Sequence, residues 1–188
     1  MSKYTVKFYT GNYRERQEAA NADGAICYVE QHFNAGGGNY SLVVVGENSS
    51  KKSQEWGQDY SYAIALEFEI KNKGIAIGGL DGRGDDNVRH TDMPAILLEP
   101  LFCDNPDHAQ IIRSAVGQDA LAVLLAQSIW KHFPKGGLVA FSIGHKGKRS
   151  NPNDRGASVL GGGMEADYAE AVLLKAKALL ESPAEQLA

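Results

Sequence analysis

Short apolar runs, separated by polar or glycine-rich segments, dominate the hydrophobic pattern of this 188-residue chain. The runs at 25–33, 95–100 and 138–143 are mostly apolar, which is typical of strands buried on both faces of a parallel sheet. In 165–180, apolar residues recur at helical spacing. The pattern predicts a single domain, residues 1–188, with an α/β fold: helices on both faces of a mostly parallel central sheet, in three layers.

Other segments complete this prediction. A strand is expected at 5–10, and helices are expected at 14–21, 59–70 and 106–132, although the aromatic residues of 59–70 would also suit a strand. The polar stretch 47–57 is predicted to be a surface loop and 71–74 a turn. His108 and His132, near the two ends of the long helix, are expected on the surface.

Four side chains that can bind a metal ion or transfer a proton stand where predicted strands end or a helix begins. His32, Glu99 and His145 lie at or just after the ends of three apolar runs, and Glu165 opens the last helix. The carboxyl ends of the strands border the crevice where sites form in open α/β sheets, so we expect the four side chains to meet.

Two histidines and one glutamate can bind a catalytic Zn²⁺ and leave its fourth position for water. A second glutamate beside that water can act as general base and then as general acid. The predicted site therefore has His32, His145 and Glu165 as ligands of one Zn²⁺ per chain and Glu99 as the catalytic residue. Glu30 shares a strand face with His32, and it could either support this histidine or be a carboxylate at the rim of the site.

Several motifs resemble those of the zinc-dependent N-acetylmuramoyl-L-alanine amidases. That family's GHGG strand end, Gly-Ala loop and Glu-Lys-Asp helix start are similar to IGHKG (143–147), RGAS (155–158) and EAD (165–167). Its HANA motif resembles HFNA (32–35), and its PAVLVE-x-GF-x-SNPED motif resembles PAILLEPLFCDNPDH (94–108). An upstream TR…AN…AD run resembles 10–24.

The order of these motifs differs from that of the family, where the GHGG strand and the glutamate helix come first. The resemblance therefore implies a circular permutation of one domain into two segments, 1–135 and 136–188, with a short Pro/Gly linker at 133–137. Lys146, Leu101 and Glu30 also depart from the family pattern, but none of them replaces a predicted ligand.

The resemblance implies hydrolysis of the amide between N-acetylmuramic acid and L-alanine in peptidoglycan, with a phage or prophage endolysin as the preferred context. A bacterial enzyme exported by other means is the alternative. Two other functions stay open. One is a zinc peptidase of the carboxypeptidase type, which would be expected to hold the substrate carboxylate with an arginine; no motif points to one, but the chain offers Arg83, Arg89, Arg113, Arg149 and Arg155. The other is a non-catalytic peptidoglycan-binding module.

The composition of the chain limits the kinds of binding partner and the cellular location that we expect. A net charge of −4 offers no basic surface for nucleic acid, and no run of about 18 apolar residues predicts a membrane span. The start of the chain, MSKYTVKFYTG, lacks the apolar region of a signal peptide, so synthesis in the cytoplasm and action on the cell wall are expected. Two cysteines are too few for a disulfide framework. We expect a monomer.

Overall fold

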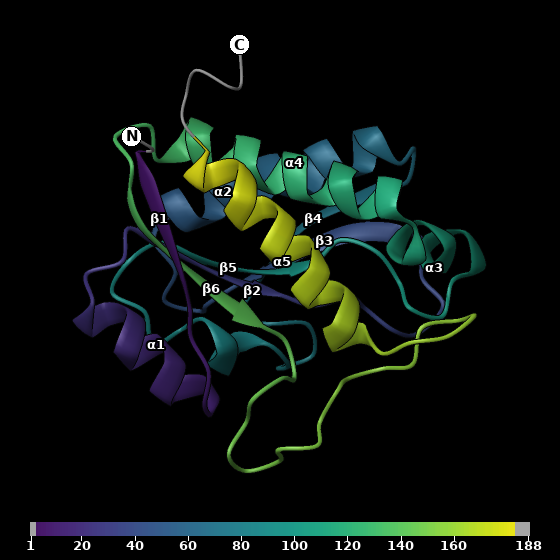
Figure 1. The fold of residues 1–188 in the computed structure, drawn as a ribbon, viewed down its shortest axis with the longest axis horizontal. Coiled ribbons are helices and arrows are strands. Elements are labelled where there is room, and N and C mark those ends of the chain that lie inside the picture. Colours follow the sequence, from purple (N-terminus) through teal and green to yellow (C-terminus); the bar gives the residue numbers. More distant parts are fainter. Residues whose placement is uncertain (1–2, 183–188) are drawn as a thin grey trace.

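The computed structural model describes residues 3–182, which form one sheet with helices on both sides (Figure 1). In chain order, the elements are β1 (Tyr4–Phe8), α1 (Tyr13–Ala22), β2 (Cys27–Gln31), β3 (Tyr40–Val45), α2 (Lys51–Glu67), β4 (Lys71–Ile77), the short 3₁₀ helix η1 (Asp85–Asn87), β5 (Ala95–Glu99), α3 (Pro106–Arg113), α4 (Ala115–His132), β6 (Gly137–Ile143) and α5 (Glu165–Glu181). The outermost residues of the predicted domain, 1–2 and 183–188, lie outside the described part of the chain.

The six strands form one mixed sheet in the order β1-β6-β2-β5-β3-β4. All neighbouring strands run parallel except β3 and β5, which are antiparallel. This arrangement confirms the predicted α/β fold with a mostly parallel sheet. Because β6, β2 and β5 are adjacent and parallel, their carboxyl ends lie at the same edge of the sheet.

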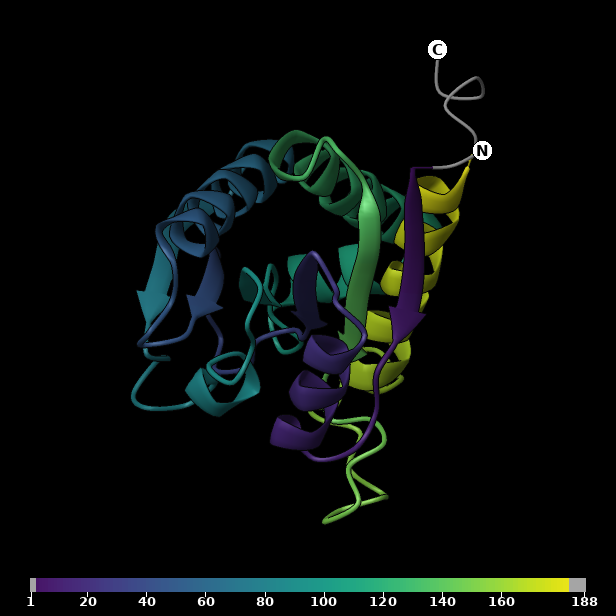
Figure 2. The same ribbon diagram turned by 90° about the vertical axis from the view of Figure 1, so that its left-hand side faces the viewer.

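The two faces of the sheet are covered differently (Figure 2). Helices α2, α4 and α5 pack on one face over the larger apolar cluster, which includes Cys27 and Val29 of β2. Helix α1 and η1 lie over the other face, where Tyr28 belongs to a smaller cluster. Because side chains alternate along a strand, β2 is buried on both faces, as its apolar sequence predicts.

Helix α2 begins earlier than predicted, and the surface loop expected at 47–57 is wrong. Ser50 caps the helix by accepting a hydrogen bond from the backbone N–H of Ser53 at 3.1 Å. Trp56, Tyr60 and Ile64 then recur every four residues and are fully buried against the sheet. The cap and this spacing outweigh the polar composition of the first turn. The expected turn at 71–74 is also wrong, since β4 begins at Lys71.

The single helix predicted for 106–132 is two helices, α3 and α4, bent by 83° at Ser114. Ser114 ends α3 and caps α4, since its Oγ accepts the backbone N–H of Gly117 at 2.9 Å. His108 is buried, which corrects its expected surface position: its Nδ1 accepts the N–H of Phe102 at 3.0 Å. Within residues 3–182, no single helix is long and apolar enough to cross a membrane; α3 and α4 meet that test only as a bent pair.

Candidate metal centre

His32 and His145 follow the carboxyl ends of the adjacent strands β2 and β6. Gly144 lies opposite His32, where a Cβ atom would come within 2.5 Å of the imidazole ring, so only glycine allows the two strand ends to approach this closely. His145 itself has a left-handed backbone (φ 65°), an uncommon conformation for a non-glycine residue. The Gly-His pair of IGHKG therefore turns the chain sharply and brings the second imidazole back over the first.

Glu165 is the first residue of α5, and its carboxylate is held by backbone groups on both sides. Oε1 accepts the N–H of Phe33 at 3.1 Å, and Oε2 accepts the N–H of Ala157 at 3.0 Å. Gly156 leaves the room for this arrangement, because a Cβ there would lie 2.4 Å from Oε2 of Glu165 and 2.7 Å from the ring of His145. The helix N-terminus also favours a negative charge at this position.

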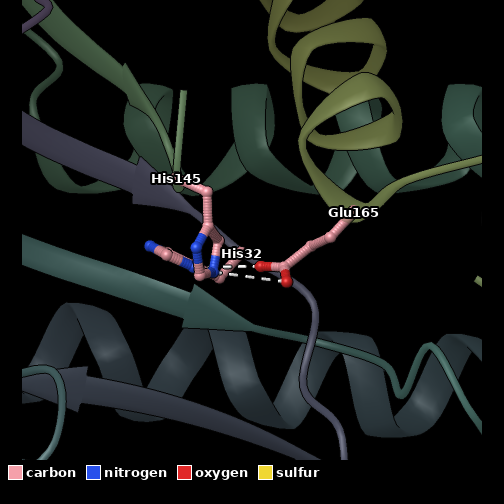
Figure 3. A group of neighbouring side chains, drawn as sticks. All are labelled: His32, His145 and Glu165. Atoms are coloured by element: carbon pink, nitrogen blue, oxygen red, sulfur yellow. Dashed lines mark hydrogen bonds and ion pairs between the residues drawn. The ribbon is translucent and has the colours of Figure 1, made fainter. Parts of the chain in front are cut away.

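The three predicted ligands meet in one group, drawn in Figure 3. Nδ1 of His32 lies 3.0 Å from Oε1 of Glu165, and Nε2 of His145 lies 3.4 Å from Oε2. One ligand atom from each residue can be chosen so that all lie within 4.8 Å of one another. Segments from the two ends of the chain thus supply one compact set of two imidazoles and one carboxylate.

Glu30 contacts His32 from the other side of the imidazole, and the alternative of a rim carboxylate is wrong. Its carboxylate is fully buried, and Oε1 lies 2.9 Å from Nε2 of His32. Asn87 donates to Oε1 at 2.5 Å, and the guanidinium of Arg16 lies 3.5 Å from Oε2. Glu30 therefore fixes the ring of His32 with Nδ1 facing Glu165, as carboxylates do for ligating histidines.

His145 has a corresponding partner in Asp154, which the sequence analysis did not identify. Both carboxylate oxygens of Asp154 lie 3.0 Å from Nδ1 of His145, which leaves Nε2 facing Glu165. Lys148 donates to Asp154 at 2.9 Å, and so does the N–H of Gly156 at 3.0 Å. The position of Asp154, two residues before the Gly-Ala pair, was the only available sequence signal.

The charges in this group depend on one another. Burial alone would raise the pKa of Glu165, but hydrogen bonds from His145 and His32 hold it well below the usual value. Glu30 behaves likewise: burial opposes ionisation, yet His32 and Arg16 lower its pKa to about 2. Burial would lower the pKa of His32, whereas its two carboxylate partners raise it well above the usual value. Both glutamates are therefore ionised at neutral pH, and they form a site that favours positive charge.

Glu99, at the end of β5, lines the same cleft as His32, His145 and Glu165. Burial is the main reason that its pKa rises to about 7, and the charge of Glu165 contributes in the same direction. Within the described chain, its Oε2 has no hydrogen-bond partner. A carboxyl group with a pKa near 7 and a free oxygen is suited to exchange a proton with a molecule in the cleft.

The cleft has a volume of about 520 Å³ and extends over the α1 side of the sheet. The irregular segment between β4 and β5 also lines it, through Leu80, Gly82, Arg83, Gly84, Asp86 and Asn87. Tyr13 of α1 and Asn34 also contribute. The space is large enough for a small part of a polymer to enter beside Glu99.

The donor set fits a zinc ion. Two imidazole nitrogens and one carboxylate are the ligands of many catalytic zinc sites, whereas Ca²⁺ and Mg²⁺ prefer oxygen donors. Each imidazole is also held by a carboxylate on the nitrogen that faces away from Glu165, an arrangement common around ligating histidines.

Comparison with known proteins agrees with this geometry. The family model described as N-acetylmuramoyl-L-alanine amidase matches residues 3–131, well over half of the chain. The chain belongs to the N-acetylmuramoyl-L-alanine amidase family. The match includes His32 and Glu99, but it stops before the strand and helix that carry His145 and Glu165.

Individual relatives of this amidase-family chain match only part of its length. An endolysin of Bacillus phage SPP1 is 32% identical over 100 residues, which are 53% of this chain and 37% of the endolysin. An N-acetylmuramoyl-L-alanine amidase from Clostridium difficile 630 has a similar structure (TM-score 0.56, 25% identity), covering 65% of this chain and 66% of that one.

The catalytic domain of CwlV, an N-acetylmuramoyl-L-alanine amidase from Bacillus (Paenibacillus) polymyxa var. colistinus, shares the fold (TM-score 0.55, 21% identity, 65% of this chain and 66% of that one). The chain therefore spans little more than a third of the endolysin and just under two thirds of these two structures.

Proposed function

We propose that this chain is a zinc-dependent N-acetylmuramoyl-L-alanine amidase, which hydrolyses the amide between N-acetylmuramic acid and L-alanine in peptidoglycan. The observation that carries this proposal is the meeting of His32, His145 and Glu165 in one cleft with Glu99. Membership of the amidase family supports the same substrate. A binding module would need neither the three donors nor a carboxyl group with a pKa near 7.

The roles of the residues follow from their surroundings. His32, through Nδ1, His145, through Nε2, and Glu165 would hold the ion, because these atoms face one another. When bound, Zn²⁺ supplies Lewis-acid chemistry: it lowers the pKa of a water toward about 7 and polarises a carbonyl. Glu99 would take the proton of the attacking water on its free oxygen and deliver it to the leaving amine of L-alanine.

We further infer that the chain acts as an endolysin on the cell wall. The support is the phage endolysin that it resembles over 100 residues. Synthesis in the cytoplasm and a monomeric state remain part of this proposal.

We also infer that the domain is circularly permuted, with 1–135 and 136–188 as its two segments. The C-terminal end of α5 lies beside β1 (Figure 2), where Glu181 accepts the N–H of Val6 at 2.8 Å and Lys177 donates to the carbonyl of Val6 at 3.0 Å. A short loop could join these two elements directly. The family match also stops before β6 and α5, as it would if their counterparts stood at the start of other members.

The test is mass spectrometry of purified peptidoglycan after digestion by the zinc-loaded chain. We expect stem peptides with a free N-terminal L-alanine and intact glycan strands, with activity lost in a chelator and restored by zinc. Release of C-terminal D-alanine alone would favour a carboxypeptidase, and binding without cleavage would favour a binding module.

A further inference from the structure

Arg83 is a cation of the cleft that the proposed mechanism does not use. It is exposed and lines the cleft together with Glu99 and the three proposed metal ligands. Within residues 3–182 its guanidinium forms no hydrogen bond or ion pair, whereas the neighbouring Arg89 is paired with Asp85 at 3.2 Å and with Asp86 at 2.9 Å. An unpaired guanidinium in a concave site is available to an anionic group of a ligand.

The backbone around Arg83 is held in a tight turn. Leu80 and Arg83 exchange both backbone hydrogen bonds, at 3.0 and 3.1 Å. Asp81 and Gly82 between them both have positive φ values, 53° and 74°, which is characteristic of a two-residue type I′ turn. At Gly79 a Cβ would lie 2.3 Å from the carbonyl oxygen of Arg83, so this glycine lets the chain close on itself. Arg83 therefore projects from a defined turn.

The same segment is anchored to the rest of the site. Asn87 donates to Glu30, which in turn contacts His32. Gln17 of α1 donates to the carbonyl of Asp86 at 2.7 Å, and Asp85 accepts the N–H of Glu47 at 2.8 Å. These contacts fix the turn relative to the metal ligands, so a group bound at Arg83 would have a defined position relative to the reacting amide.

Arg83 shares the cleft with the carboxyl group that would serve the leaving amine. Both Arg83 and Glu99 line this cleft, and Glu99 would protonate the amine of the departing peptide. An acidic group on that peptide would therefore have the unpaired guanidinium of Arg83 in the same cleft. In peptidoglycan stems, the residue after L-alanine is a glutamate linked through its γ-carboxyl, and its α-carboxyl is free in some walls and amidated in others.

We propose that Arg83 binds the free α-carboxylate of this second stem residue and so sets a preference for non-amidated stems. The inference rests on the proposed amidase function and adds a specificity determinant to it. The planar guanidinium of Arg83 would pair with this carboxylate and so orient the leaving peptide. An amidated stem carries a neutral carboxamide at the same place, so it could not form the ion pair.

The experiment compares two muramoyl dipeptides that differ only in a free or amidated α-carboxyl on the second residue. The wild-type chain should hydrolyse the free form with about tenfold higher kcat/KM, the scale of one hydrogen-bonded charge pair. Arg83→Gln should remove this preference, mainly by raising KM for the free form, with zinc content unchanged. Arg83→Lys should keep part of it.

Lys51→Gln is the matched control for charge, since Lys51 is highly exposed at the start of α2 and does not line the cleft. It should leave the preference intact. If Arg83→Gln kept the wild-type preference for the free form, the proposed role of Arg83 would be wrong, while the proposed amidase function would stand. If the wild-type chain hydrolysed neither dipeptide nor intact peptidoglycan, the proposed function itself would be wrong, and the role of Arg83 with it.

Discussion

Each histidine of the site is held on one ring nitrogen by a carboxylate, so that the other nitrogen faces Glu165. For His32 that carboxylate is Glu30, which is buried and contacts Arg16 and Asn87 as well. The carboxylate of Glu30 therefore joins the imidazole of His32 to a buried guanidinium. Its expected effect is on the orientation and basicity of His32.

Glu30→Gln should weaken zinc binding by about 10- to 100-fold, the usual effect of losing a carboxylate behind a ligating histidine. Competition with a chromophoric chelator measures this affinity directly. Glu18→Gln, on the exposed face of α1, is the control and should bind zinc as the wild type does. Because Arg16 loses a buried partner, affinities are compared at a temperature where circular dichroism shows both variants folded. Unchanged affinity in folded Glu30→Gln would contradict a positioning role.

Glu99→Gln should retain zinc and the fold but lose activity by at least about 10²–10⁴-fold, the usual contribution of general acid–base catalysis. The change keeps the shape of the side chain and removes its ability to take a proton. Zinc content and turnover of peptidoglycan are measured on the same preparation. Near-native turnover would exclude Glu99 as the proton carrier, and loss of zinc would indicate a ligand instead.

The sequence predicted those functional residues that stand at a recognisable local feature of the hydrophobic pattern. His32, Glu99, His145 and Glu165 each stand where an apolar run ends or a helix begins, and the structure brings them to one cleft. Asp154 and the partners of Glu30 carry no such signal. Asn87 reaches Glu30 from a segment 57 residues away, and a contact of this kind depends on how distant segments pack.

At the scale of elements, the segment between β6 and α5 shapes the site through its glycines. Gly156 has φ 73° and no room for a side chain, because Glu165 and His145 lie against it. Gly24, between α1 and β2, has a similar φ of 67°, but a Cβ there would meet nothing within 4 Å. Substitutions at these two positions can therefore distinguish the effect of backbone strain from a steric effect on the metal centre.

Gly156→Ala and Gly24→Ala should each lose about 1–2 kcal/mol of stability, the cost of placing a non-glycine residue in the left-handed region. Only Gly156→Ala should also lose zinc, because the added methyl group displaces Glu165. Thermal unfolding and zinc analysis of both variants test this. Full zinc content in Gly156→Ala would contradict the required close approach.

The elements that the sequence did not predict correctly show which physical signals were weak. The strand β3 follows a glycine-rich stretch, and its sequence gave no separate prediction. The first turn of α2 is polar, yet the Ser50 cap and the buried Trp56 make it helical. In the region of α3 and α4, continuous apolar periodicity concealed a bend that depends on one serine, Ser114. Caps and bends are single-residue features, and a hydrophobic pattern averages over them.

At the scale of the whole molecule, the two ligands His145 and Glu165 come from the last quarter of the chain and His32 comes from the first. If the domain is permuted, the chain can be rearranged without disturbing the site. Pro134 and Lys135 are exposed between α4 and β6, whereas Gly137 donates to the carbonyl of Lys3 at 2.9 Å and should stay with its strand.

Joining Ala188 to Met1 and opening the chain between Lys135 and Gly136 should therefore give a folded, zinc-binding protein. Loop closure depends weakly on loop length, so stability should change by only about 1–2 kcal/mol. Zinc content and thermal unfolding are the measurements. An opening within α2, between Tyr60 and Ser61, is the control and should abolish folding, since both residues are fully buried. An unfolded or metal-free product from the first rearrangement would contradict the permutation.

Segments from the first and the last quarter of the chain are proposed to form one zinc site. Anomalous diffraction at the zinc edge, on crystals of the full chain grown with zinc, locates the ion directly. We expect one peak per chain, at about 2.0–2.2 Å from Nδ1 of His32, Nε2 of His145 and a carboxylate oxygen of Glu165. A peak bound by other residues, or none at these three side chains, would contradict the account.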